Sequence, residues 1–327
     1  MNLTPRISVI VPSYNHRQFL PMRMDSILRQ TRQDFELILL DDASPDGSGD
    51  FLETFLDRPN VRVIRNAQNT GSPFAQWNRG IKEAKGELIW IAESDDVADP
   101  QLLETLTEIL DQHPSVGLAF CRSQRIDETG VILTEDTTVD RIEPWQNDFR
   151  MKGRDAIHGS LYVSNVIVSA SAVVFRRKLY EQAGPASTNL RLAGDWLQWC
   201  KILMESDLAY VSRTLSGSRI HSNTRRQGTT SSGTLELESL AVQRFVRSRM
   251  TIEPTQIRQG ARRVSTSWLQ TMRAGRFSGS LIRHPMFLWR LFRTDPRIAA
   301  SFMMNWPYAF LAWCLKRFLL RKSSAFL

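Results

Sequence analysis

The sequence predicts an α/β fold, with a mostly parallel sheet flanked by helices and a helical, basic extension at the C-terminal end. Short runs rich in Ile, Val and Leu begin every 26 to 29 residues through the first part of the chain, which is typical of buried strands. Helical patterns lie between these runs, and such alternation indicates βαβ units. Residues 234–327 hold 16 basic and 4 acidic residues, which marks the extension.

The first four connections of the predicted sheet are helical. The predicted strands are residues 7–11, 35–40, 61–64, 87–92 and 116–120, and the predicted helices are residues 18–30, 48–57, 73–84 and 100–112. Ser72 and Pro73 are typical of an N-cap and a first helical turn. Further along, residues 166–175 predict a strand and residues 177–183 a helix that ends before Gly184.

Composition limits the class of protein. The chain has 327 residues, 42% of them hydrophobic and 23% charged, which is ordinary for a globular protein with a sizeable core. Its three cysteines, Cys121, Cys200 and Cys314, are widely spaced. This spacing excludes a disulfide scaffold and argues against a structural zinc site. A reducing, cytoplasmic setting is expected.

Charge divides the chain at about residue 233. Residues 1–233 have a net charge of −4 and residues 234–327 a net charge of +12. The basic region contains an apolar run at residues 298–315, which is at the short limit for a membrane span. One interpretation is peripheral binding to an anionic membrane surface at the inner face of the cytoplasmic membrane. The other is a helical subdomain that packs on the rest of the protein with its arginines solvated.

Polar side chains follow three of the predicted strands. Pro12 and Tyr14 follow the first strand, Asp42 follows the second, and Glu93-Ser94-Asp95-Asp96 follows the fourth. In parallel sheets, ligands bind beyond the carboxyl ends of the strands, so these clusters predict one binding site. The sequence lacks GxGxxG and GxxxxGK[ST] motifs, which argues against a dinucleotide dehydrogenase and a P-loop phosphotransferase.

The acidic cluster after the fourth strand has two interpretations. Carboxylates at a strand end suit Mg²⁺ or Mn²⁺, which prefer oxygen ligands. Alternatively, Glu93, Asp95 and Asp96 only cap the helix that follows. The spacing of these residues does not decide between the two.

Residues 5–99 resemble the nucleotide-binding half of a family 2 glycosyltransferase with the Rossmann-like GT-A fold. The resemblance continues more weakly to Gly194-Asp195-Trp196 and His221 and covers about two thirds of the chain. The motifs that carry it are the 7–15 segment ending Pro-Ser-Tyr-Asn, Gln30-Thr31, the Asp-Asp-x-Ser of residues 41–44, Asn69-Thr70-Gly71, Asn78-x-Gly80, Ala84-x-Gly86-Glu87 and Glu93-Ser94-Asp95-Asp96.

The resemblance implies an inverting glycosyltransferase that uses Mn²⁺ or Mg²⁺. The donor would be a nucleoside-diphosphate sugar, UDP- or dTDP-linked, and the acceptor a glycan or a lipid-linked sugar. Residues 1–99 would bind the nucleotide-sugar, residues 100–233 would form the acceptor half, and no nucleic acid partner is expected. By the resemblance, Pro12, Tyr14, Asp42 and Asp95 would bind the donor, and Asp95, Asp96 and His221 would hold the metal.

Some of these positions keep a second interpretation. Asp42 would accept a hydrogen bond from the nucleobase, or it could cap the helix after Ser48. His221 would lie near the diphosphate, or it could be structural. Glu93 stands where the family usually has Asp, so its role is open, and Arg219 would contact phosphate or be solvated.

Asp195 is the candidate catalytic base, because the resemblance implies an acidic residue there that deprotonates the acceptor hydroxyl. The other interpretation is an N-cap for the helix that follows. The family often has Glu-Asp at this place, and here Gly194 replaces the Glu. Trp196 would stack on an acceptor sugar or pack in the core.

Two other function classes are consistent with part of the pattern. A nucleotidyltransferase would make nucleotide-sugars with a similar sheet, but it would normally have a glycine-rich basic loop after the first strand. A non-catalytic nucleic-acid-binding protein would explain the basic C-terminal region. It would not explain the acidic strand ends, which repel phosphate in the absence of a metal.

Overall fold

The computed structural model describes residues 5–135, 145–221, 232–274, 276–278 and 282–323. The chain divides into two compact units. The first unit comprises Met1–Ile157 and Val166–His221, and the second comprises His158–Asn165 and Ser222–Leu327. No sequence pattern predicted that residues 158–165 join the second unit. The boundary at residue 233 stays a prediction.

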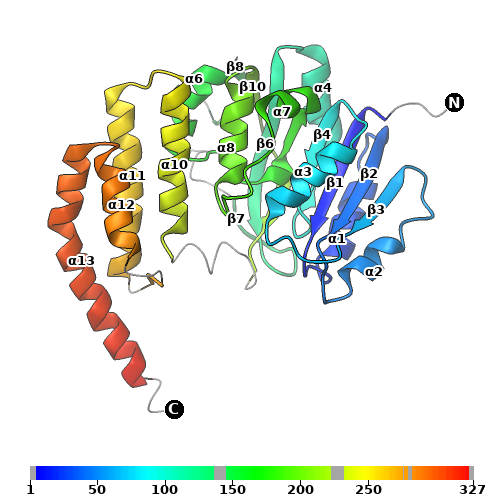
Figure 1. The fold of residues 1–327 in the computed structure, drawn as a ribbon. Coiled ribbons are helices and arrows are strands. Elements are labelled where there is room, and N and C mark those ends of the chain that lie inside the picture. The colour runs from blue at the N-terminus through cyan, green and yellow to red at the C-terminus, as the bar shows by residue number, and fades with distance from the viewer. Residues whose placement is uncertain (1–4, 136–144, 222–231, 275, 279–281, 324–327) are drawn as a thin grey trace. The chain divides into compact units, whose positions relative to one another are not determined.

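The first unit is built on one large mixed sheet (Figure 1) with the strand order β3-β2-β1-β4-β9-β6-β10-β5. Strands β1 to β4 are parallel to one another, and so are β6 and β10. Strand β9 runs antiparallel between β4 and β6, a reversal that the sequence did not predict. The strands are β1 (Ile7–Ser13), β2 (Phe35–Asp41), β3 (Val61–Arg65), β4 (Leu88–Ile91), β5 (Val97–Ala98), β6 (Val116–Ile126), β7 (Ile132–Glu135), β8 (Phe149–Lys152), β9 (Val173–Arg176) and β10 (Asp207–Arg219).

Helices connect and cover these strands, so the predicted α/β class is confirmed. The strand predicted at residues 166–175 is shorter in the structure, because Ala170–Ala172 form a 3₁₀ turn capped by Ser169. The helices of the first unit are α1 (Leu20–Leu28), α2 (Ser48–Glu53), α3 (Pro73–Glu83), α4 (Leu102–Gln112), α6 (Gly153–Ala156), α7 (Arg177–Ala183) and α8 (Gly194–Leu203).

Both faces of the sheet are buried, which explains why its strands are continuous apolar runs. Val9 and Leu37 belong to one core cluster with residues of α1 and α4. Ile10, which points to the opposite face, lies against α3. A Cβ atom on Gly80 of α3 would lie 2.4 Å from Ile10 Cγ2, so only glycine permits this close approach.

The second unit is helical and has its own apolar core. Trp268 stacks on Phe287 with ring centroids 4.1 Å apart, and its Nε1–H donates a hydrogen bond to Nδ1 of the buried His284 at 3.0 Å. The predicted C-terminal helical region is therefore present. Its helices are α10 (Thr234–Arg249), α11 (Pro254–Arg273), α12 (Arg283–Phe292) and α13 (Pro296–Ser323).

Helices α12 and α13 expose large apolar side chains. The most exposed are Ile282 just before α12, Trp289 and Phe292 on α12, and Met304, Tyr308 and Leu311 on α13, each at least 54% exposed. Within the described part of the chain, no helix combines the length and the apolar character needed to cross a bilayer.

Candidate active site

The loops after β1 and β2 are tied together at the carboxyl edge of the sheet. The backbone N–H of Asp42 donates to the carbonyl of Ser13 at 2.9 Å, and that of Asn15 donates to Ser44 Oγ at 3.0 Å. Asn15 and Ala43 have φ values of 57° and 59°. Non-glycine residues rarely adopt this left-handed region, and such strain concentrates at functional sites.

Asp42 is a buried acceptor that organises the 66–76 segment. Its Oδ1 accepts from Asn66 Nδ2 at 2.6 Å, Thr70 N–H at 3.0 Å and Gln76 Nε2 at 2.8 Å. Its Oδ2 accepts from the Thr70 hydroxyl at 2.8 Å. No side chain caps α2, whose N-cap is Gly47, so Asp42 does not serve as the helix cap considered above. Gln76 is bound to this carboxylate.

The other donor-side residues lie at the same strand ends. Pro12 is a buried residue of β1 that pairs with Leu40 of β2, and Tyr14 directly after β1 is 39% exposed. Tyr14 is therefore open to a ligand, whereas Pro12 shapes the backbone beneath it.

The three carboxylates after β4 occupy different environments. Asp96 is buried: its Oδ2 accepts from Ser169 Oγ at 2.8 Å and its Oδ1 from the backbone N–H of Arg219 at 2.9 Å. Burial and then repulsion from Asp95 raise the pKa of Asp96 to about 6. The same two causes raise the pKa of Glu93 to about 8, although Trp77 Nε1–H donates to it at 2.8 Å.

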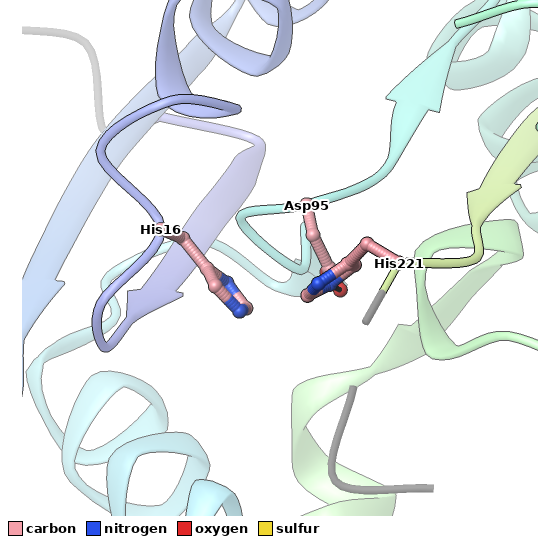
Figure 2. A group of neighbouring side chains, drawn as sticks. All are labelled: His16, Asp95 and His221. Atoms are coloured by element: carbon pink, nitrogen blue, oxygen red, sulfur yellow. Dashed lines mark hydrogen bonds and ion pairs between the residues drawn. The ribbon is translucent and has the colours of Figure 1, made fainter. Parts of the chain in front are cut away.

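Asp95 meets two histidines. Its Oδ2 lies 3.1 Å from His221 Nε2, and Figure 2 shows His16, from the loop after β1, converging on the same place. The ligand atoms of these three side chains all lie within 4.8 Å of one another. Burial alone would raise the pKa of Asp95, but its interactions with His221 and His16 outweigh burial and hold the pKa below its usual value. Two imidazoles and one carboxylate suit a divalent cation.

His16 belongs to this cluster although the sequence gave it no partner pattern. Its Nδ1 lies 2.8 Å from Ser94 Oγ, and its ring makes an edge contact with the His221 ring, with centroids 5.3 Å apart. Only the positive-φ turn at Asn15 and the return of β10 bring these residues together. The sequence gave no signal for His16, whereas the family resemblance had already placed His221 with Asp95.

A fully buried arginine lies behind the acidic loop. Arg23 of α1 is 0% exposed, and its guanidinium lies 4.8 Å from the ring centroid of Trp90. Its Nη2 makes a long, 3.4 Å hydrogen bond to Ser171 Oγ, and its Nε and Nη1 have no hydrogen-bond partner among the described residues. Burial lowers the pKa of Arg23 to about 10, against the opposing effect of Asp96, Asp95 and Glu93. It therefore stays charged at neutral pH.

The sequence contained a feature that marks Arg23 as a buried charge. Arg23 stands between Leu20 and Ile27 on the apolar face of α1, where a charged side chain is unexpected. Such a residue is retained where it balances other buried charges. The buried Asp96 and the half-buried Asp95 are such charges.

Arg219 is buried, so the solvated alternative is wrong, and its contact with phosphate stays a prediction. It is 4% exposed, and its guanidinium donates to the carbonyls of Asp95 at 2.6 Å, Asp127 at 2.7 Å and Glu128 at 2.8 Å. It clamps the acidic loop to the loop after β6. Its position two residues before His221 ties that histidine to the same framework.

Asp195 lies in the first turn of α8, one residue after the helix begins. The N-cap is Ala193, without a side-chain cap, so Asp195 does not cap the helix. A Cβ on Gly194 would lie 2.4 Å from the Phe74 ring, which explains why the family's Glu is absent here. Trp196 and Trp199 are both buried, which favours core packing over stacking on a sugar.

Comparisons with known proteins agree with this architecture. The sequence model of the family described as Glycosyl transferase family 2 matches residues 8–184, more than half of the chain. The glycosyltransferase GlyG of Streptococcus pneumoniae serotype 4 is 27% identical over 217 residues, which are 65% of this chain and 72% of GlyG.

Two solved structures share the fold. S. aureus TarS 1–349 in complex with UDP matches with a TM-score of 0.66 at 17% identity, covering 94% of this chain and 89% of that chain. The Pyrobaculum calidifontis mannosyltransferase PcManGT, in complex with GDP-Man and Mn²⁺, matches with a TM-score of 0.57 at 17% identity. The match covers 96% of this chain and 87% of PcManGT. With the strand-end site, the family match confirms the resemblance seen in the sequence: the chain belongs to glycosyl transferase family 2 and is a glycosyltransferase with the GT-A fold.

Proposed function

We propose that this enzyme transfers a sugar from a UDP- or dTDP-linked donor to a glycan or lipid-linked acceptor, with inversion at the anomeric carbon. The observation that carries the proposal is the contact between Asp95 and His221 at the end of β4, beside the loops after β1 and β2. A nucleotidyltransferase and a nucleic-acid-binding protein would not belong to this family.

Asp95 and His221 would hold a divalent metal. Bound there, the metal supplies Lewis-acid stabilisation of the charge on the departing nucleoside diphosphate. The depressed pKa of Asp95 keeps this carboxylate ionised and available. Asp96 remains a predicted ligand, but both of its oxygens already accept hydrogen bonds from the protein.

Asp42, Pro12 and Tyr14 would bind the nucleoside. Each oxygen of an ionised carboxylate has two lone pairs, and Oδ2 of Asp42 accepts only from the Thr70 hydroxyl in the described structure, which leaves one lone pair on that oxygen. That oxygen would accept the imide N–H of uracil or thymine. Adenine and cytosine present no such donor, so the carboxylate selects between base classes.

Asp195 would be the general base. A carboxylate in a first helical turn is stabilised in its ionised form by the helix dipole, and Asp195 is half-buried there. It would take the proton of the acceptor hydroxyl as that oxygen attacks the anomeric carbon, while the nucleoside diphosphate leaves from the opposite face. Direct displacement of this kind inverts the configuration.

A donor screen tests the proposal. The full chain is incubated with UDP-, dTDP-, GDP- and CMP-linked sugars in Mn²⁺, Mg²⁺ or EDTA. Binding is followed by thermal shift, and slow hydrolysis by release of the nucleotide. We expect a metal-dependent response to a uridine or thymidine donor alone. Selection of CMP-sugars would overturn the role of Asp42, because cytosine has no ring N–H to donate. Selection of GDP-sugars would overturn the proposed uridine or thymidine donor, and no response to any donor would overturn the proposed donor chemistry.

We also propose that the second unit binds an anionic membrane surface, where a lipid-linked acceptor would be found. The exposed Trp289 and Phe292 alternate with Arg290 and Arg293 on α12, and the region carries a net charge of +12. Apolar side chains beside cations are the pattern of an interfacial helix.

Vesicle flotation tests this second proposal. We expect the full chain to float with phosphatidylglycerol-containing vesicles and less with pure phosphatidylcholine vesicles. Trp289→Gln with Phe292→Gln should reduce flotation at least fivefold. The matched control is Leu56→Gln with Val131→Gln, which removes equally exposed apolar residues of the first unit. Equal flotation of both variants would contradict the proposal.

A further inference from the structure

We infer that His16 is a third ligand of the metal, and that its imidazole makes the site select transition-metal ions over Mg²⁺. This inference rests on the proposed function, because it concerns the metal that Asp95 and His221 would hold. It goes beyond the family resemblance, which drew on carboxylates and His221 alone. The order of affinities that follows is Co²⁺ above Mn²⁺ above Mg²⁺.

The geometry admits one ion between the three side chains. Ligand atoms about 2.1 Å from a metal lie about 3 Å apart when adjacent and about 4.2 Å apart when opposite. The Asp95 Oδ2 to His221 Nε2 distance is 3.1 Å, as for adjacent ligands. The ligand atoms of all three side chains, including His16, lie within 4.8 Å of one another, so a side-chain movement of about 0.6 Å brings the widest pair to the separation of opposite ligands.

The ring of His16 is already oriented. The Oγ atom of the buried Ser94, which is 1% exposed, lies 2.8 Å from His16 Nδ1. A hydrogen bond at one imidazole nitrogen fixes the ring and assigns the other nitrogen, Nε2, as the ligand. Phe19 supports both histidines, with ring centroids 5.8 Å from His16 and 4.6 Å from His221. Figure 2 shows the imidazoles directed toward one another beside Asp95.

Among the described residues, the group whose ligand atoms lie close together consists of His16, Asp95 and His221, so a nitrogen takes the third position. Asp96 accepts hydrogen bonds on both oxygens, from Ser169 and from the backbone of Arg219. The donor set is therefore two imidazoles and one carboxylate. Mg²⁺ prefers oxygen ligands and keeps its waters, whereas first-row transition ions accept imidazole readily.

Direct metal binding, without any donor, tests the inference. Isothermal titration with Co²⁺, Mn²⁺ and Mg²⁺ is performed on the full chain and on His16→Ala, His16→Asp and His113→Ala. We expect His16→Ala to weaken Co²⁺ and Mn²⁺ binding at least tenfold. His16→Asp should lower the ratio of Co²⁺ to Mg²⁺ affinity at least tenfold, because it replaces nitrogen with oxygen. His113→Ala, which removes a histidine outside the cluster, should match the parent protein.

Electron spin-echo modulation counts the imidazole nitrogens bound to Mn²⁺. This count would not change if His16 only supported the structure of the site. We expect two coordinated imidazole nitrogens in the parent protein and one in His16→Ala. Co²⁺ affinity within twofold of the parent in His16→Ala, or a parent protein without preference for Co²⁺ over Mg²⁺, would overturn the inference. Either result would leave the proposed function intact if a uridine or thymidine donor is still hydrolysed, whereas failure of the donor screen would remove that function independently.

Discussion

The two units of this protein bury polar groups in opposite ways. In the first unit, buried charges gather at one edge of a sheet: Arg23, Asp42, Asp96 and Arg219 are each at most 5% exposed. In the second unit, α10 buries the carboxylates of Glu236 and Glu238, and the core is an aromatic cluster around Trp268 and Phe287 that holds the neutral His284. The first unit also exposes a mixture of charges, whereas the second is strongly basic.

This difference suits different roles for the two units: chemistry in the first unit and surface binding in the second. Buried charges destabilise a fold unless they are paired, so their concentration marks the place where chemistry requires them. A mainly aromatic core does not need buried ion pairs. The apolar and basic side chains that the second unit exposes suit the membrane-binding surface that we propose for it. Four predictions test this contrast, ordered from the largest expected effect to the smallest.

Removing the carboxylate of Asp195 should have the largest effect. Asp195→Asn keeps the shape of the side chain but cannot accept the hydroxyl proton, so we expect kcat to fall about a thousandfold, or roughly 4 kcal/mol in activation free energy. Donor binding and thermal stability should stay near those of the parent protein. The measurement is steady-state transfer once the donor is known, with thermal shift for binding.

The matched control is Asp155→Asn, which changes an exposed Asp in the first turn of α6. We expect it to keep kcat within twofold. Near-normal turnover of Asp195→Asn would refute its assignment as the base.

Removing the buried cation should destabilise the first unit. Arg23→Met leaves Asp96 and Asp95 without a nearby opposing charge, so we expect the free energy of unfolding to fall by about 3 to 5 kcal/mol, measured by urea denaturation without metal. Excess Mn²⁺ should restore part of this loss. The control is Arg29→Met. It removes an exposed arginine, the C-cap residue of α1, which pairs with Asp25. It should change the free energy of unfolding by less than about 0.5 kcal/mol. Equal effects of the two substitutions would contradict this account.

The second unit should be the acid-sensitive one. Burial lowers the pKa of His284 to about 4, whereas the unfolded chain takes up this proton near pH 6.5. The unfolded state therefore binds more protons between these values, and stability falls as the pH drops from 6.5 toward 4, by about 3 kcal/mol in total. Thermal unfolding of the full chain across this range measures the effect.

His284→Gln separates this group from the other titrating residues. Glutamine does not titrate but can still accept the Trp268 N–H, so the variant should lose about 3 kcal/mol less than the parent between pH 6.5 and pH 4. An unchanged pH dependence would mean that His284 does not control the acid response.

The smallest effect should come from the glycine that replaces the family's Glu. Gly194→Ala would place Cβ 2.4 Å from the Phe74 ring, and overpacking of this kind costs about 1 to 2 kcal/mol. Adding Phe74→Leu should recover most of that loss, as a double-mutant cycle in urea denaturation would show. The control is Gly159→Ala in the second unit, where a Cβ meets nothing within 4 Å. Destabilisation of both variants alike would refute the packing explanation.

The sequence alone determined the α/β class, the family and the order of strands and helices through residue 120, and it predicted a site at the strand ends; β5, β7, β8 and β10 were not predicted. These follow from local patterns: the predicted strands that became β1, β2, β3 and β6 begin at the predicted residue, and the helical run before Gly184 is α7 (Arg177–Ala183). Apolar periodicity reports burial directly, so a parallel sheet covered on both faces is readable from the chain. The antiparallel β9 was not readable, because strand direction depends on the path of the 145–172 segment and not on its composition.

The tertiary structure decided which side chains meet, apart from Asp95 and His221, which the family resemblance had already paired. His16, Asp95 and His221 are far apart in the sequence and converge because β1, β4 and β10 belong to one sheet. The hydrogen-bond partners of Asp42 and Asp96, the clamp made by Arg219 and the buried charge of Arg23 likewise depend on contacts between distant elements. A residue's type and local pattern specify what it can do, but its surroundings in the fold specify its protonation, its partners and therefore its role.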